Sequence, residues 1–208
     1  MDNQAKLGMI AGILLIFFLL VGLVSASIIY TTSGDITEED LNRITNEVVD
    51  EICSYLQIKH IIGQYQMIQN EHTIKKIGIL IKPYVSQNID ISHISIEVCN
   101  GEQYHMLFYS ELVGSIRSST LFEHPLWDLM NSSGFSVLST IDDDNSIGSS
   151  HMINKNTDMA FILITLPDNL AMKYGDQIEI TILPSPGMSR TVWFEAPLPI
   201  KNVVTLYP

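Results

Sequence analysis

The chain has 208 residues, which is enough for one domain or for one domain with an appended segment. Aliphatic, aromatic, Met and Cys residues make up 46% of it, so a sizeable hydrophobic core can form. Eleven Lys and Arg residues stand against 23 Asp and Glu residues, a net charge of −12, which argues against a nucleic-acid partner held by its phosphates. Two cysteines are too few for a disulfide-stapled scaffold or a four-thiolate zinc site.

The first predicted element is an uncharged apolar run of 24 residues, Leu7–Tyr30. As a helix rising ~1.5 Å per residue it would be ~36 Å long, enough to cross a bilayer. Helices in the core of soluble domains are rarely apolar all round over such a length. A secretory signal peptide is the alternative, but Met1–Lys6 carries only one Lys and one Asp, and the run exceeds the usual ~7–15 residues. We therefore predict that this segment lies in a membrane at some stage.

Small residues in the apolar run are candidates for close helix–helix contacts. Gly8 and Gly12 are four residues apart and Gly22 follows, and small side chains let apolar helices approach closely. Chance explains these glycines equally well, since glycine is common in membrane spans. The predicted packing residues are Gly8, Gly12, Gly22, Leu14, Leu15, Phe17, Phe18 and Leu20.

The next segment is acidic. Seven acids and one base lie between Asp35 and Glu51, so half of the net charge falls there, and such a segment is expected outside the cytoplasm. Thr37 is a predicted N-cap, with Asp40 in the first turn. Apolar residues then recur at steps of three and four, which predicts an amphipathic helix running to about Ile62. No proline precedes Pro83, so residues 1–62 are expected to form one long helix or two nearly collinear ones.

From about Thr73 the pattern changes to short β-rich runs separated by turn residues. Asn100-Gly101 lies between two of these runs, which predicts a hairpin. The predicted strands are Ile74–Val85, Ile91–Val98, Gln103–Tyr109, Phe135–Ile141, Met159–Leu166, Gln177–Leu183, Thr191–Phe194 and Val203–Tyr207. We predict an α+β chain in which residues 63–208 form an Ig-like antiparallel β-sandwich or barrel.

No pattern of catalytic residues is evident in the sequence. The six histidines are scattered without metal-ligand spacing, and no nucleophile elbow, phosphate-binding glycine loop or Cys-x-x-Cys occurs. We therefore predict no enzyme and no cofactor. Asp142-Asp143-Asp144-Asn145 is the one oxygen-rich cluster, but it lacks the spacing of a calcium loop. A solvated acidic loop is the favoured interpretation, with Ca²⁺ or another divalent cation as the alternative.

Two further features bear on an exported protein. Asn131-Ser132-Ser133 is the only Asn-x-Ser/Thr triplet, and in a polar loop outside the cell Asn131 is a predicted glycosylation site. Cys53 and Cys99 could form a disulfide, but two separate buried thiols are an equally good prediction because the sequence gives no distance between them.

The residues at both ends of the chain resemble those of the archaellins, the archaeal flagellins. An apolar helix begins almost at the first residue and ends at Thr32-Ser33-Gly34, before an amphipathic helix. Ile89-Asp90-Ile91-Ser92 is similar to the Ile-Asp-Leu-Ser that precedes a strand in that family, and the hydrophobic Val203–Pro208 resembles its closing strand. Position 5 is Ala5 rather than the glutamate of bacterial type IV pilins, which separates the chain from those pilins.

The resemblance implies a subunit similar to a type IV pilin. Its precursor would lie in the membrane through the apolar helix and be trimmed by a prepilin-type peptidase. No basic leader ending in glycine precedes the apolar run, so the sequence is expected to be that of the mature form. Many copies, alone or together with other archaellins, would then form an extracellular helical filament for swimming, with the apolar helices in its core. Burial of that surface at ~25 cal/mol per Å² would stabilise such a polymer at every repeat.

Two alternatives to the swimming filament remain open. An archaeal adhesion pilin would use the same kind of helix but carry a binding surface on its outer domain. A bitopic membrane protein with a β-sandwich, such as a stator-like accessory protein, would keep its apolar helix in the bilayer.

Overall fold

The computed structural model describes residues 55–68, 70–116 and 120–208, together with Leu15, Phe18, residues 43–45 and Val48. The chain divides into two compact units, Met1–Asn46 and Glu47–Pro208. Leu15, Phe18, residues 43–45 and Val48 are α-helical, which agrees with the predicted helix at these positions. The other predicted packing residues lie outside the described residues: Gly8, Gly12, Leu14, Phe17, Leu20 and Gly22. Within the described part of the chain, no helix has the length and apolarity needed to cross a membrane.

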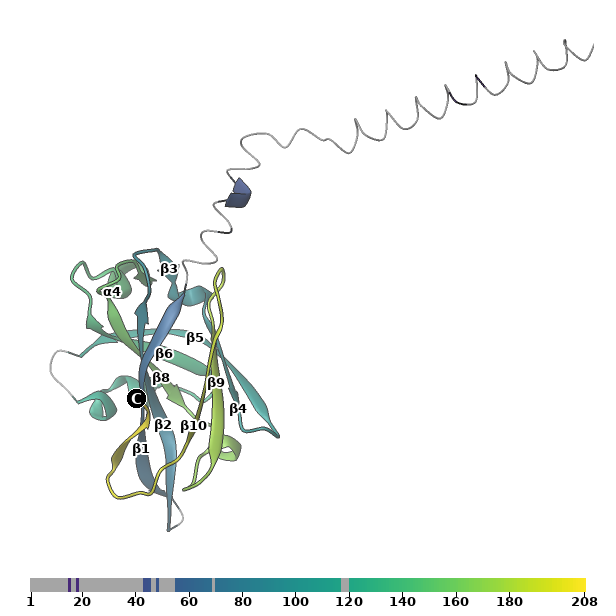
Figure 1. Cartoon of the computed structure of the whole chain (residues 1–208). Helices are drawn as coiled ribbons and strands as arrows, with labels where there is room; N and C mark the ends of the chain where they lie inside the picture. Colours follow the sequence, from purple (N-terminus) through teal and green to yellow (C-terminus); the bar gives the residue numbers. More distant parts are fainter. Residues whose placement is uncertain are drawn as a thin grey trace, which may run out of the picture. The chain divides into compact units, whose positions relative to one another are not determined.

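The described part of the second unit is built almost entirely from β-strands (Figure 1). The strands are β1 (Leu56–Ile68), β2 (Glu71–Pro83), β3 (Ile89–Asp90), β4 (Ser95–Cys99), β5 (Tyr104–Ser115), β6 (Gly134–Ile141), β7 (Met152–Ile153), β8 (Met159–Thr165), β9 (Gln177–Leu183), β10 (Arg190–Glu195) and β11 (Val203–Tyr207). The short helices are η1 (Ile91–His93), η2 (Leu121–Glu123), α3 (Leu126–Leu129), α4 (Ser146–Ser150) and η3 (Asp168–Leu170).

Nine strands form a single sheet in the order β10-β9-β4-β5-β6-β8-β2-β1-β11, and β3 pairs with β7. The sheet curls so that its edge strands β10 and β11 contact each other, which gives a nearly closed, barrel-like domain. The predicted hairpin is confirmed, because β4 pairs with β5 and Cys99 lies opposite Tyr104. The β-rich domain is thus confirmed in the barrel form rather than as two separate packed sheets.

The predicted end of the amphipathic helix is wrong. Residues 56–62 belong to β1, which pairs with β2 from Leu56 opposite Pro83 to Ile68 opposite Glu71. The β-domain therefore begins before residue 63. The physical reason is a register shift in β1 between Ile58 and His60, which interrupts the alternation of the strand. The apolar residues Ile58 and Ile61 therefore follow each other at a spacing of three, which resembles the apolar spacing of a helix. The predicted boundary at residues 62 and 63 therefore falls inside β1.

The prediction of a purely antiparallel sheet is also wrong, because β5 and β6 pair in parallel. Parallel neighbours need a crossover of a dozen or more residues, whereas antiparallel ones can be joined by a tight turn. The connection from Ile116 to Ser133 provides that crossover and contains η2 and α3.

The crossover creates a second, smaller core on the outer side of the sheet. The main core fills the inside of the barrel and includes Ile77, Phe135 and Ile162. The second core packs Leu121, Phe122, Leu126 and Trp127 of the crossover against Leu138 and Leu163 of the sheet. Strands β6 and β8 are therefore largely buried on both faces, which explains the continuous apolar sequence of β8.

Candidate functional site

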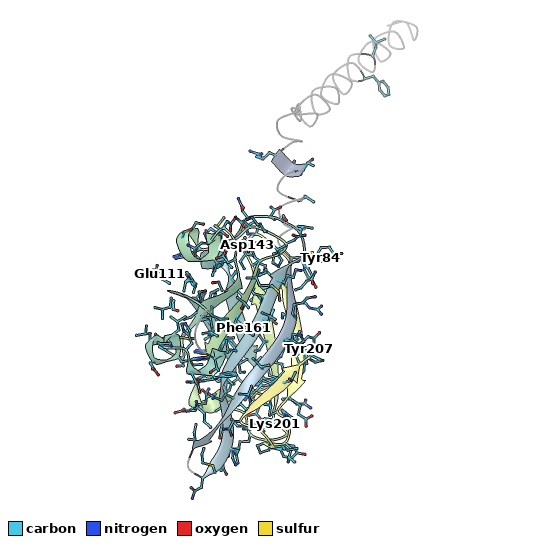
Figure 2. All side chains as sticks on the ribbon, turned by 90° about the vertical axis from the view of Figure 1, so that its left-hand side faces the viewer. Tyr84, Glu111, Asp143, Phe161, Lys201 and Tyr207 are labelled. Atoms are coloured by element: carbon cyan, nitrogen blue, oxygen red, sulfur yellow. The ribbon has the colours of Figure 1, made fainter. Side chains whose placement is uncertain are left out.

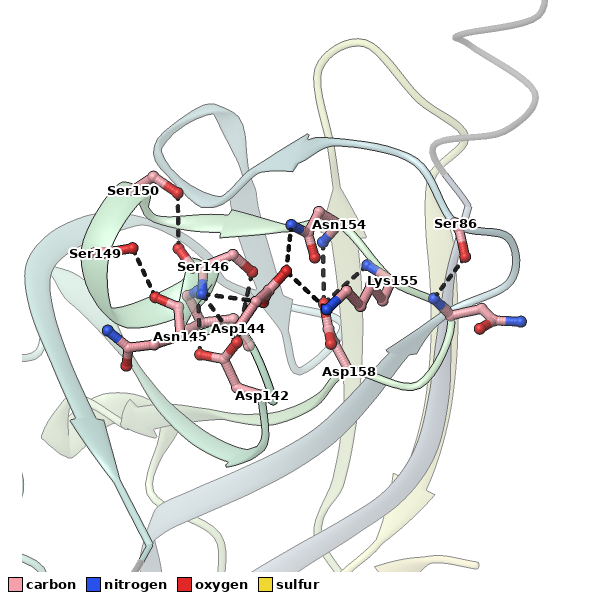
Figure 3. A network of polar contacts seen from close by, with 12 residues as sticks. Ser86, Asp142, Asp144, Asn145, Ser146, Ser149, Ser150, Asn154, Lys155 and Asp158 are labelled. Atoms are coloured by element: carbon pink, nitrogen blue, oxygen red, sulfur yellow. Dashed lines mark hydrogen bonds and ion pairs between the residues drawn. The ribbon is translucent and has the colours of Figure 1, made fainter.

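The acidic loop after β6 is stabilised by hydrogen bonds that its own carboxylates accept (Figure 3). Asp142 accepts hydrogen bonds from the backbone N–H groups of Ser146 (3.0 Å) and Ile147 (3.2 Å), at the start of α4. Asp144 accepts from the Asn154 side-chain amide at 3.0 Å and forms an ion pair of 2.9 Å with Lys155. These contacts tie the loop to the turn that precedes β8.

Asp158 approaches this loop from the other side. One of its carboxylate oxygens, Oδ2, accepts from the backbone N–H groups of Asn154 at 3.1 Å and Lys155 at 2.8 Å. Its side chain is 0% exposed, and its other oxygen, Oδ1, has no hydrogen-bond partner among the described residues. The side-chain oxygen of Asn154 is likewise buried and unpaired. Two unpaired acceptors inside a protein are costly unless a positive group or a donor meets them.

Asp142, Asp144 and Asp158 each place a carboxylate oxygen within 4.8 Å of the other two. Such spacing suits a hard cation with oxygen ligands at ~2.3–2.6 Å. Lys155 supplies one positive charge against these three carboxyl groups. The ammonium of Lys155 lowers the pKa of Asp144, whereas burial raises the pKa of Asp142. The cluster therefore has excess negative charge and free acceptor oxygens, and its residues fit a divalent cation.

The sequence indicated only part of this cluster. It singled out Asp142-Asp143-Asp144-Asn145, but Asp143 is exposed and does not belong to the three. Asp158 was missed because it comes from a separate turn. The available signal was its place after Asn156-Thr157 and directly before the apolar strand β8, where a buried acid is unusual.

The predicted glycosylation site is accessible. Asn131 is exposed in the loop between α3 and β6, and its side-chain oxygen accepts from the backbone N–H of Ser133 at 3.0 Å. The same loop is held to β5, because the carbonyl oxygen of Ser132 lies 2.8 Å from Nε2 of His105. Asn131 is thus presented on a fixed turn rather than within a strand.

One of the two cysteines lies within the described part of the chain. Cys99 is a free thiol at the end of β4, half-exposed, and its sulfur accepts from the backbone N–H of Gly101 at 3.3 Å. Cys53 lies outside the described residues, so the predicted choice between a disulfide and two thiols stays open.

The site residues described above comprise an acidic loop with a candidate cation site and a candidate glycosylation site. The uncharged run Leu7–Tyr30 in front of a β-domain built on one wrapped sheet is the arrangement expected of the filament-subunit class of proteins.

Comparison with known proteins gives the family. A model of the archaeal-type flagellin family matches residues 5–194. The chain is 26% identical to flagellin B3 of Methanocaldococcus jannaschii over 99% of this chain and 96% of that protein. It is 22% identical to flagellin B3 of Methanococcus voltae over 94% of this chain and 92% of that protein. The chain belongs to the archaeal-type flagellin family and is a structural subunit of the archaeal flagellar filament.

Solved structures agree in fold. The crystal structure of the flagellin FlaB1 of Methanocaldococcus jannaschii matches with a TM-score of 0.65 and 25% identity, over 73% of this chain and 96% of that one. The archaeal flagellum of Methanospirillum hungatei strain JF1 matches with a TM-score of 0.54 and 14% identity, over 97% and 99% of the two chains. The second likeness concerns the fold alone.

Proposed function

We propose that the chain polymerises through residues 1 to about 55 and carries its β-domain on the outside of an extracellular swimming filament. Before assembly the apolar segment lies in the membrane, and a prepilin-type peptidase trims the precursor. Outside the cell, an apolar helix avoids water by packing against copies of itself. The observation that carries the proposal is the uncharged run Leu7–Tyr30 in a chain of the flagellin family.

The test replaces a small residue of the proposed helix. Gly12→Leu should reduce filament formation while the protein still inserts into the membrane, because a larger side chain separates closely packed helices. Leu19→Ile, which keeps the side-chain volume at a position outside the predicted packing residues, is the matched control and should assemble normally. Electron microscopy and mass spectrometry of sheared filaments give the readout. Normal filaments from Gly12→Leu would show that the glycine plays no part in packing.

The buried and unpaired Oδ1 of Asp158 favours a second role, cation binding. We propose that Asp142, Asp144 and Asp158 hold a divalent cation such as Ca²⁺, which fastens the acidic loop to the turn before β8. The cation would supply the positive charge that Lys155 alone does not balance.

Metal removal tests this role. A chelator should lower the melting temperature of purified filaments, and added Ca²⁺ should restore it. Asp158→Asn should abolish the response, whereas Asp143→Asn, which changes a neighbouring acid outside the cluster, should keep it. An unchanged melting temperature after chelation would contradict cation binding.

Asn131 is proposed to carry a glycan, because it is exposed within the only acceptor triplet of the chain. Mass spectrometry of the filament protein should show a mass shift on the peptide that contains Asn131, and Asn131→Gln should remove it.

A further inference from the structure

One outer face of the sheet is not covered by any other described element. It is formed by β10, β9, β4 and the first part of β5, whose outward residues lie side by side across the strands. The rows are Trp193-Glu179-Cys99-Tyr104, Thr191-Thr181-Glu97-Met106 and Leu183-Ser95-Phe108. We call this surface the aromatic face, after Tyr104, Phe108 and Trp193.

The aromatic face exposes unusually large side chains. Trp193 is 67% exposed, Tyr104 is 73% exposed and Phe108 is 61% exposed. With ~4.8 Å between strands, Trp193 and Tyr104 stand ~14 Å apart. On the other half of the sheet, by contrast, η2 and α3 cover the outer side. Exposed aromatic residues gathered on one face mark an interaction surface.

The aromatic face is also acidic. Glu97 and Glu179 point outward from β4 and β9, and neither has an ion-pair partner among the described residues. Glu195 adds a third acid at the end of β10. Arg190, the one base of β10, stands opposite the buried Ile182 and thus alternates to the other side of the sheet. A partner for this face should therefore be apolar and basic.

The loop between β10 and β11 has that character. Together with the first residues of β11 it lines a groove of about 370 Å³ within residues 197–205. Leu198, Ile200 and Val203 are exposed there, with Ile200 at 79%. Lys201 is exposed in the same loop and has no ion-pair partner among the described residues. Figure 2 shows Lys201 toward the end of the domain opposite Asp143, away from the acidic loop. We call these residues the 197–205 loop.

The 197–205 loop is held to β1 by Tyr65 and by the pairing of β11 with β1. The hydroxyl of Tyr65 donates to the carbonyl oxygen of Pro197 at 2.5 Å, and the backbone N–H of Tyr65 donates to the carbonyl oxygen of Asn202 at 2.7 Å. Tyr65 itself is buried in the main core. Because both arms of the loop are anchored, Leu198 and Ile200 are presented to solvent with little ordering entropy left to lose on binding.

We propose that the 197–205 loop of one copy of this chain binds the aromatic face of the next copy. Leu198 and Ile200 pack against the exposed rings, and Lys201 faces the acids of the aromatic face. The opposite charges give the contact its register. The two surfaces share no residue, so the contact is heterologous and a terminal copy keeps one surface free. Such a contact can repeat along the open helical polymer proposed above. This inference rests on the proposed polymerisation and adds an outer contact to it.

A native cysteine allows a direct test, because Cys99 lies in the aromatic face between Glu179 and Tyr104. The full chain with Ile200→Cys is expressed in the native cells in place of the original copy, and sheared filaments are treated with the thiol oxidant diamide. We expect a ladder of disulfide-linked multimers without reductant, with Cys99 joined to position 200 in the peptide map. Cys99→Ser in the same chain should remove the ladder.

Leu129→Cys is the matched control. Leu129 is 67% exposed, compared with 79% for Ile200, but it lies on α3, beside the covered half of the sheet. It should give no link to Cys99. Filaments in which Ile200→Cys links to Cys99 no more than Leu129→Cys does would overturn the proposed contact. Linked dimers without larger multimers would overturn its repeating nature. Absence of the unaltered chain from filaments would instead overturn the proposed polymerisation.

Charge reversal gives a second test that needs no oxidation and stands if Ile200→Cys prevents assembly. Lys201→Glu should lower the yield of filaments roughly tenfold, the effect of losing ~1.4 kcal/mol per contact. Glu179→Lys added to Lys201→Glu should restore the yield, because the pair is then reversed. Equal yields from the unaltered chain and from Lys201→Glu would contradict the role of the charges.

Discussion

Tyr109 is a polar side chain in an apolar place. Its ring packs against Phe135 with centroids 5.8 Å apart and against His151 at 5.4 Å. Its hydroxyl is buried and has no hydrogen-bond partner among the described residues. Burial, with the nearby carboxylates of Glu111 and Asp90, raises the pKa of Tyr109 to about 12. The domain therefore holds this phenol in its neutral form.

We expect Tyr109→Phe to stabilise the domain by about 1 kcal/mol near neutral pH, since it removes an unpaired buried hydroxyl. Folding raises the pKa of Tyr109 from 10.0 to about 12, so this phenol ionises more easily in the unfolded chain. The free energy of unfolding is therefore unaffected by this ionisation below pH 10 and falls as the pH rises from 10 toward 12. The gain from Tyr109→Phe should thus grow in alkali. Denaturant unfolding of residues 55–208 at pH 8 and pH 11 measures both effects. Tyr104→Phe, at an exposed tyrosine, is the control. If the free energy of unfolding falls equally between pH 8 and pH 11 in Tyr109→Phe and in Tyr104→Phe, the assignment is contradicted.

Individual residues were predicted unevenly from the sequence. Asn131 was predictable because a triplet motif and a polar loop are both local signals. Asp142 and Asp144 were predictable as oxygen ligands, but Asp158 was not, because only the fold brings it beside them. The aromatic face escaped notice for the same reason, since Trp193 and Tyr104 are far apart in the chain and become neighbours through β9 and β4.

At the scale of elements, β1 is the strand that the sequence concealed. Its residues Ile58, Ile61 and Tyr65 recur at steps of three and four because two register shifts displace the alternation, between Ile58 and His60 and between Gln64 and Tyr65. Strand β9 has no such shift, alternates strictly and was predicted at its observed bounds. The predicted strand Ile91–Val98 began too early, because Ile91–His93 form η1 and β4 starts at Ser95. The parallel pairing of β5 with β6 was not predictable, because the crossover contains no long helical pattern.

The revised start of the domain has a measurable consequence. A chain of residues 55–208 should fold with a cooperative melt and a β-type circular dichroism spectrum. A chain of residues 63–208 loses Leu56 and Ile61, which are fully buried, and half of the pairing between β1 and β2. At ~1.5–3 kcal/mol for each buried side chain, this loss approaches the ~5–15 kcal/mol stability of a whole domain. We expect the shorter chain to be unfolded, and equal melting temperatures would contradict the role assigned to β1.

Gly114 tests how the crossover sits on the sheet. A Cβ at Gly114 would lie 2.8 Å from Cε1 of His124 and 2.9 Å from Cδ1 of Leu126. Gly114→Val should therefore push the crossover outward and destabilise the domain by about 1–3 kcal/mol. Ser115→Val changes the adjacent exposed residue and should cost little, because β-branched residues suit strands. Chemical denaturation of the two variants of residues 55–208 compares them, and a tolerated Gly114→Val would mean that the crossover is loosely packed.

At the scale of the whole molecule, apolarity and charge are separated along the chain in the way a polymer requires. The uncharged run Leu7–Tyr30 suits a filament core, and the acids between Asp35 and Glu51 follow it directly. The β-domain adds two different outer surfaces, one aromatic and acidic and one apolar and basic. The separation of apolarity and charge along the chain could be predicted from composition alone. The two outer surfaces of the β-domain could not, because they depend on strand order. Membership of the archaeal-type flagellin family agrees with the separation along the chain, and the proposed contact between copies would use the two outer surfaces.

The central claim is that this chain forms the filament through its N-terminal segment. Electron cryomicroscopy of filaments sheared from the native cells tests it most directly. We expect a helical polymer in which the residues from 1 to about 55 of every copy form the central bundle of helices, with the β-domain outside. A filament built from another chain, with this one left in the membrane fraction as a single-span protein, would contradict the account.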